Sequence, residues 1–116
     1  MKPLVYVAGP YTRADPVLNT RNACLFADEL IAAGAAVIVP HLSLLWHAIS
    51  PAPVDAWYAR DLDVLAHCHA VAWLPGASEG ADAEVAFAQR HDIPVYSTSH
   101  DGSRAALFTF IKEWMP

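Results

Sequence analysis

The sequence predicts a three-layer α/β domain, with helices on both faces of a small parallel sheet of four to five strands. Short runs of apolar, β-branched residues alternate with longer segments whose apolar residues recur at helical spacing. Several of the short runs end in glycine or proline, as buried strands do where they enter loops. The chain has 116 residues, so we expect residues 1–116 to form a single domain with one core.

The first part of the chain has the pattern of a strand, a helix and a second strand. Residues 4–8 (LVYVA) form an apolar strand, and Asp15 and Pro16 are typical of an N-cap followed by proline at the first helical position. The helix is expected to end at about residue 33, and residues 36–39 form the second strand. The predicted apolar stripe of this helix holds Leu18, Leu25, Phe26, Leu30 and Ala33. Such a unit has a right-handed crossover and parallel strands.

The rest of the chain continues the alternation. Residues 42–49 fit either a short helix or a packed loop. The elements expected after them are a helix over about 54–67, a strand over 70–74, a helix over about 79–90, a strand over 93–96 and a helix over 104–114. The resulting fold is flavodoxin-like or Rossmann-like, and such sheets bind ligands beyond the carboxyl ends of their strands. Any chemistry is therefore expected at residues 9–15, 41–53 and 75–78.

Composition and charge argue against several classes of function. The formal charge is −5 and no basic cluster occurs, which disfavours a polynucleotide partner but allows a single mononucleotide. No apolar run approaches the roughly 18 residues of a membrane helix, and the first apolar run is too short for a secretory signal. We therefore expect a cytoplasmic protein with no membrane partner. Because 55% of the residues are hydrophobic and 16% charged, we also expect a homo-oligomer.

Cysteine and histidine spacing gives no metal signature. Cys24 and Cys68 have no neighbouring cysteine, which favours buried thiols over a disulfide or a zinc site. Only His67 and His69 are close in sequence, and their spacing fits no familiar ligand pattern. No metal is predicted.

Two carboxylates are expected on the inner faces of helices. Glu84 falls within about 60° of the centre of the stripe that contains Ala81 and Val85, and Asp61 shares the arc of Trp57. Paired carboxylates of this kind are typical of enzymes that cleave glycosidic bonds. The alternatives are a Glu84 whose carboxylate reaches water and an Asp61 that caps a nearby loop.

Two segments have features of anion sites. Residues 9–15 precede a helix and could bind phosphate through backbone N–H groups, Thr12 and Arg13, although they match neither a P-loop nor a dinucleotide fingerprint. Ser78 and Gly80 begin the helix of Glu84 and form a second possible anion site, for which plain N-capping is the alternative.

Six stretches, which together span nearly the whole chain, carry a resemblance to a known family. They are Tyr6-Val7-Ala8-Gly9-Pro10-Tyr11, Asn19 with Gly34, Val39-Pro40-His41-Leu42, Asp61-Leu62, Leu74-Pro75-Gly76-x-Ser78-x-Gly80-x-x-x-Glu84 and Ile93-Pro94-Val95. In their order and spacing the sequence resembles the nucleoside 2-deoxyribosyltransferase superfamily, in particular its small bacterial and phage members.

The resemblance implies roles for individual residues. Glu84 matches the nucleophile that forms a glycosyl-enzyme intermediate, and Asp61 matches the acid that positions or protonates the departing base. Ser78 stands where the transferases carry an aspartate and is similar to the serine of the branch that hydrolyses nucleoside 5′-monophosphates. The transferases also take an asparagine from a neighbouring subunit, for which this chain has no obvious counterpart. The residues predicted to bind substrate are Tyr6, Gly9, Pro10, Tyr11, Arg13, Asn19, His41, Ser78 and Gly80.

Aromatic residues are candidates for contact with the base. His41, near Trp46 and His47, is interpreted as a wall that contacts base or sugar. Tyr11, Trp46 and Trp57 are candidates to stack on the base, with core packing as the alternative.

The sequence thus predicts cleavage or transfer of the N-glycosidic bond of a nucleoside or nucleoside 5′-monophosphate, with no cofactor. The alternatives are a nucleotide-binding module of the same fold without turnover and an enzyme that hydrolyses a phosphoester.

Overall fold

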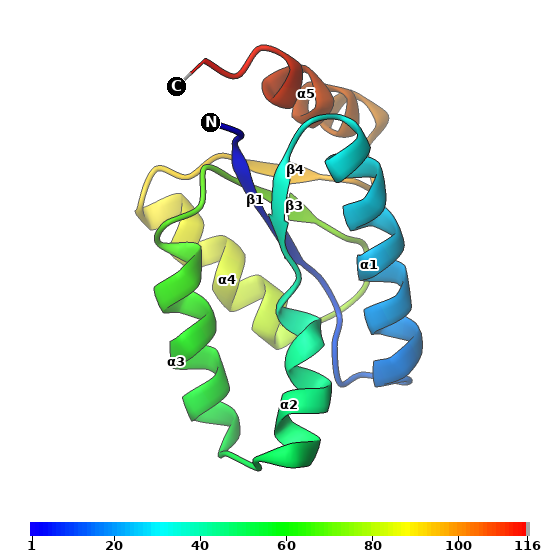
Figure 1. Ribbon diagram of the computed structural model, residues 1–116, viewed down its shortest axis with the longest axis vertical. Helices are drawn as coiled ribbons and strands as arrows, with labels where there is room; N and C mark the ends of the chain where they lie inside the picture. The colour runs from blue at the N-terminus through cyan, green and yellow to red at the C-terminus, as the bar shows by residue number, and fades with distance from the viewer. Residues whose placement is uncertain (116) are drawn as a thin grey trace.

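The structure, a computed structural model that describes residues 1–115, contains one four-stranded parallel sheet with helices on both faces (Figure 1). The elements in order are β1 (Leu4–Ala8), α1 (Pro16–Ala32), β2 (Ala36–Ile38), the 3-10 turn η1 (Pro40–Leu42), α2 (Ser43–Ile49), α3 (Val54–Leu65), β3 (Ala70–Trp73), α4 (Glu79–Arg90), β4 (Val95–Ser97) and α5 (Asp101–Lys112). The strand order is β2-β1-β3-β4, and every neighbouring pair is parallel. This confirms the predicted flavodoxin-like α/β class.

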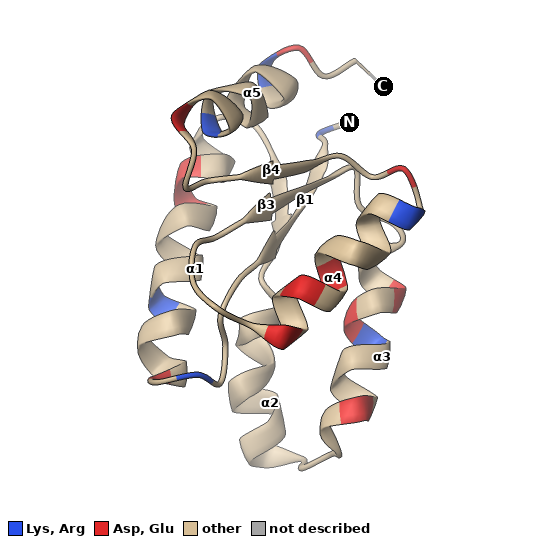
Figure 2. Ribbon diagram, turned by 180° about the vertical axis from the view of Figure 1, so that it is seen from behind, with Lys and Arg blue, Asp and Glu red and all other residues tan. Residues whose placement is uncertain are grey.

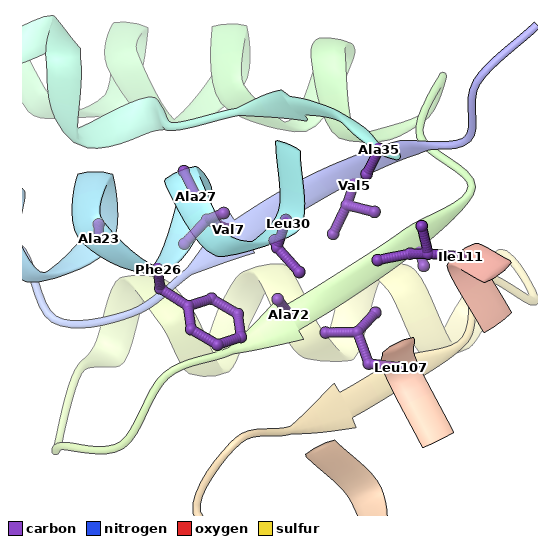
Figure 3. Close-up of a cluster of buried hydrophobic side chains, with 11 residues drawn as sticks. Val5, Val7, Ala23, Phe26, Ala27, Leu30, Ala35, Ala72, Leu107 and Ile111 are labelled. Carbon is purple, nitrogen blue, oxygen red and sulfur yellow. The ribbon is translucent and has the colours of Figure 1, made fainter. Parts of the chain in front are cut away.

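The side chains of β1 alternate between two buried clusters. Val5 and Val7 belong to the cluster that packs against α1 and α5, where Leu30 and Leu107 meet them (Figure 3). Tyr6 belongs to the opposite cluster, with residues of α3 and α4. Because successive side chains of a strand point to opposite faces, the phenol of Tyr6 is directed toward the α4 layer.

The predicted stripe of α1 is partly wrong. Leu18 and Leu25 are 49% and 47% exposed. Ala33 is exposed as well. The buried residues of the helix are Ala23, Phe26, Ala27 and Leu30. Two of these side chains are small, which lets the helix approach the sheet closely beside the larger Phe26 and Leu30.

Several predicted boundaries also change. Residues 42–49, left open between helix and loop, are mostly helical in α2, whereas 101–103, expected in a loop, begin α5. Both cysteines are free, but only Cys68 is buried. In the described part of the chain, no helix has the length and apolarity needed to cross a membrane.

The loops after β1 and β3 touch at the carboxyl edge of the sheet. β2 pairs with one edge of β1 and β3 pairs with the other edge, so the strand order reverses between β1 and β3. Gly76 has a φ of +118°, and a Cβ atom there would lie 2.5 Å from Cγ of Pro10. Glycine is therefore required where these two loops meet.

Leu30→Ala should lower the free energy of unfolding by about 2–5 kcal/mol, because Leu30 is fully buried between α1 and the sheet. Leu25→Ala, the same substitution on the exposed side of α1, should cost less than about 1 kcal/mol. Urea unfolding followed by circular dichroism measures both. Equal losses would contradict the observed inner face of the helix.

Candidate functional site

A pocket of about 600 Å³ lies at the carboxyl edge of the sheet, where the strand order reverses. Its wall combines the loop after β1, the residues after β2, helices α2 and α3, and the first turns of α4. Eight of the eleven residues predicted as catalytic or substrate-binding line it: Gly9, Tyr11, Arg13, His41, Asp61, Ser78, Gly80 and Glu84. Residues far apart in the sequence thus meet in one cavity.

Glu84 is held by a fully buried tyrosine. Ser78 caps α4, its Oγ accepting the N–H of Ala81 at 3.1 Å, and so fixes where the helix begins. One and a half turns later Glu84 reaches β1, where the hydroxyl of Tyr6 donates a hydrogen bond to its Oε2. Tyr6 has no exposed surface, and burial raises its pKa, so it stays protonated and acts as the donor.

The environment of Glu84 favours its neutral form. Burial raises the pKa of Glu84 to about 7; the hydrogen bond from Tyr6 lowers it, and the charge of Asp61 raises it. The net direction shows that loss of hydration outweighs the stabilisation by the phenol. Glu84 therefore exchanges a proton near neutral pH, which is unusual for a glutamate.

Asp61 is the second carboxylate of the pocket. It lies half-buried on α3, which packs beside α4. Burial raises the pKa of Asp61 to about 6, against the opposing positive charge of Arg60. Acidic positions occur on both α3 and α4, whereas α2 has none (Figure 2). Two carboxylates that titrate near neutrality thus line the same cavity.

The loop after β1 is tied down on two sides. Nε2 of His41, a buried side chain, lies 3.0 Å from the carbonyl oxygen of Pro10. From α1, the side-chain amide of Asn19 donates to the carbonyl oxygens of Tyr11 at 3.0 Å and Arg13 at 2.7 Å. With these three carbonyl oxygens engaged by the protein, the loop is held in shape without a ligand.

Three residues predicted to bind substrate are not in the pocket wall. Tyr6 lies behind Glu84 and contacts it. Pro10 and Asn19 line a second cavity of about 430 Å³. Pro10 and Asn19 thus shape the loop, and Tyr6 orients a carboxylate.

The aromatic candidates also separate. Tyr11 and Trp57 line the pocket. Trp46 instead packs against Trp57, with their ring centroids 5.2 Å apart. The sequence placed His47 only as a neighbour of His41 and gave Tyr58 no role, yet both line the pocket. The helical spacing of Ser43, Leu44 and His47 was the available signal, and it required residues 42–49 to be read as a helix.

The chemistry of the wall suits a neutral or anionic organic ligand. Within residues 1–115, no group of three histidine, cysteine or carboxylate side chains lies close enough to hold a metal ion. The pocket instead offers a proton-exchanging carboxylate pair, aromatic surface and the amino end of α4. These groups can attack an electrophilic carbon, move a proton and attract an anion.

Comparison with known families places the chain. The model of a family described as a domain of unknown function, DUF4406, matches residues 3–97, from β1 to the end of β4. No curated protein matches the chain. The matched segment contains every residue of the pocket wall. The chain therefore belongs to the DUF4406 family.

Proposed function

We propose that the protein cleaves or transfers the N-glycosidic bond of a nucleoside or nucleoside 5′-monophosphate, with Glu84 as the nucleophile. The observation that carries this proposal is the presence of Glu84 and Asp61 in the wall of one pocket, with Glu84 oriented by a buried Tyr6. The resemblance of the sequence to nucleoside 2-deoxyribosyltransferases supports the same chemistry. A cytoplasmic location remains a prediction.

Each group has a defined part in the reaction. The hydrogen bond from Tyr6 occupies Oε2 of Glu84, which leaves Oε1 to attack C1′ of the sugar. As the C1′–N bond breaks, its electron pair moves to the base, and Asp61 supplies the proton that neutralises the base. Positive charge that develops on the sugar is stabilised by the Glu84 carboxylate. Water or a second base then attacks C1′, the ionised Asp61 accepts the proton that this nucleophile loses, and the bond between C1′ and Glu84 breaks to restore both carboxyl groups.

The reaction requires one proton on the pair. Glu84 attacks as a carboxylate, and Asp61 donates as an acid. With pKa values of about 7 and about 6, the two groups titrate together, and the singly protonated pair is most abundant between these values. Because Glu84 has the higher pKa, the proton of the pair lies mainly on Glu84, and the reactive form, with the proton on Asp61, is the minor one.

One end of the pocket suits a 5′-phosphate. Ser78, Glu79 and Gly80 open α4, a 12-residue helix whose amino end carries positive partial charge. Thr12 and Arg13 face the same cavity from the loop after β1. The hydroxyl of Ser78 accepts from Ala81 and still has a proton to donate, so capping and phosphate binding are compatible.

Glu84→Gln should reduce release of free base by at least about 10³-fold, because the amide is a far weaker nucleophile and cannot balance charge at C1′. The assay incubates the protein with ribonucleosides, deoxyribonucleosides and their 5′-monophosphates, with and without an acceptor base, and separates the bases by chromatography.

Asp82→Asn is the matched control, since Asp82 is an exposed acid of α4 outside the pocket wall. It should leave release unchanged. Tight binding of a nucleotide without release would identify a binding module instead. Release of inorganic phosphate without free base would identify a phosphoester hydrolase.

The pH dependence of kcat/KM should be bell-shaped, with its maximum between about pH 6 and 7. Below the lower pKa both carboxyl groups are protonated and Glu84 cannot attack; above the higher pKa Asp61 has lost the proton that the base needs. Asp61→Asn should lower kcat/KM. With a substrate whose base leaves without being protonated, the profile of this variant should also lack the decrease at alkaline pH. A profile that is flat from pH 5 to 8 would contradict the roles of both carboxylates.

We also propose that the protein is a homo-oligomer that associates through α2. None of the side chains of this helix is buried, and none is charged (Figure 2). Six large apolar side chains on and beside it are between 46% and 75% exposed: Leu42, Leu45, Trp46, Ile49, Val54 and Tyr58. Exposed apolar side chains gathered on one element are typical of a surface that contacts another protein. Without Lys or Arg, α2 does not resemble a membrane-surface helix, which favours a second copy as the partner.

Replacing Leu45 and Ile49 together by glutamate should convert the oligomer to a monomer, because two charges would be buried in the contact. Leu25→Glu, on the exposed face of α1, should leave the assembly intact. Sedimentation velocity measures the mass of each variant. A wild-type protein that is monomeric at micromolar concentration would refute the proposal.

A further inference from the structure

The ring of His47 has one nitrogen fully engaged by the protein. Its Nδ1 accepts a hydrogen bond from Nε1 of Trp57 at 2.8 Å and another from the backbone N–H of Ala52 at 3.2 Å. Both partners can only donate. Nδ1 must therefore carry a lone pair, and the proton of the neutral ring resides on Nε2.

The partner that fixes this tautomer is itself rigid. Trp57 is 8% exposed, and the guanidinium of Arg60 lies 4.4 Å from the ring centroids of both Trp57 and Trp46. The two indoles also pack edge to face. Nδ1 of His47 is thus held by a packed aromatic cluster. Rotation of the ring or a change of tautomer would break both of its hydrogen bonds.

The opposite side of the ring remains open. His47, Ala52 and Trp57 all line the pocket, and within residues 1–115 the Nε2 atom of His47 has no hydrogen-bond partner. Nε2 lies across the ring from Nδ1 and so faces away from Trp57 and Ala52. The result is a fixed N–H donor on a residue of the pocket wall.

The position of this donor indicates which part of a ligand it meets. Trp57 and Asp61 are four residues apart on α3 and share one face of the helix. Asp61 is the group that protonates the departing base under the proposed function. His47 is hydrogen-bonded to Trp57, which lies one helical turn before Asp61. The N–H donor of His47 therefore lies on the base side of the reacting bond rather than on the phosphate side.

We propose that the Nε2–H group of His47 donates a hydrogen bond to the base of the bound nucleoside and selects bases that carry an acceptor at that edge. This inference rests on the proposed function and specifies the substrate further. A base that lacks the acceptor leaves the N–H group without a partner in the complex, so the analogue should be disfavoured about tenfold in kcat/KM.

The first test reads the tautomer and is independent of any activity. Two-dimensional ¹⁵N–¹H spectra of the imidazole, assigned by comparison with His47→Asn, should show protonated Nε2 and unprotonated Nδ1 at neutral pH. In Trp57→Phe, which removes the stronger donor to Nδ1, the ring should populate both tautomers. A ring protonated on Nδ1 in the wild type would overturn the inference.

The second test separates the two nitrogen atoms. In His47→Asn the amide oxygen can replace Nδ1 as the acceptor for Trp57, but nothing replaces the Nε2–H donor; in His47→Gln the amide nitrogen can replace the donor. The substrates are pairs that differ in one exocyclic oxygen, inosine against purine riboside and uridine against 2-pyrimidinone riboside, as nucleosides and 5′-monophosphates. His67→Asn, at an exposed histidine outside the pocket wall, is the matched control.

The wild type and His67→Asn should prefer the acceptor-bearing member of at least one pair about tenfold, His47→Asn should lose this preference, and His47→Gln should retain part of it. Activity with equal rates for both members of every pair, or a preference that survives His47→Asn, would overturn the inference and leave the proposed function standing. Absence of binding and cleavage for all substrates would overturn the proposed function itself.

Discussion

The hydrogen bond between Tyr6 and Glu84 joins the central strand to α4 and places an ionisable group where water cannot solvate it well. The folded state raises the pKa of Glu84 from 4.5 to about 7. Below about pH 4.5 the group is protonated in both folded and unfolded chains and costs no stability. Between about pH 4.5 and 7 only the unfolded chain releases the proton, so the stability of the fold falls as the pH rises, and above about pH 7 the cost stays constant. A glutamine at this position would avoid that cost. An ionisable group retained at a cost in stability, at the wall of a cavity, is typical of a functional site.

Much of this arrangement follows from local rules that the sequence displays. Successive side chains of residues 4–8 point to opposite faces of the sheet, so Tyr6 and Val7 belong to different buried clusters. Helical periodicity brings Glu84 and Asp61 inward from two different helices. Glycine and proline mark the loops at the carboxyl edge. Each of these features depends on near neighbours in the sequence, which is why the fold class and the two inward carboxylates could be predicted from the sequence.

The features that sequence reasoning missed depend on distant contacts or on relative side-chain size. The inner face of α1 is set by the fit of Ala23 and Ala27 against the sheet, which the larger and more conspicuous Leu25 obscures. Asn19 looked like a ligand-binding residue, but its amide serves backbone carbonyl oxygens six and eight residues earlier. The link between His47 and Trp57 crosses a proline-rich connection, and no periodic pattern spans it.

The pocket therefore has two parts with different physical support. The chemical part, around Glu84, is built on the sheet and on α4 and shares the stability of the core. The other part consists of α2 and the start of α3. No residue of α2 is buried, and this part is held by contacts among His47, Trp57 and Arg60. A seven-residue helix cannot be stable alone, so this part depends on those side-chain contacts and on whatever covers its apolar face. Substitutions in α2 can then alter recognition of a ligand while the carboxylate pair and its protonation remain intact, which lets one scaffold serve different substrates with the same chemistry.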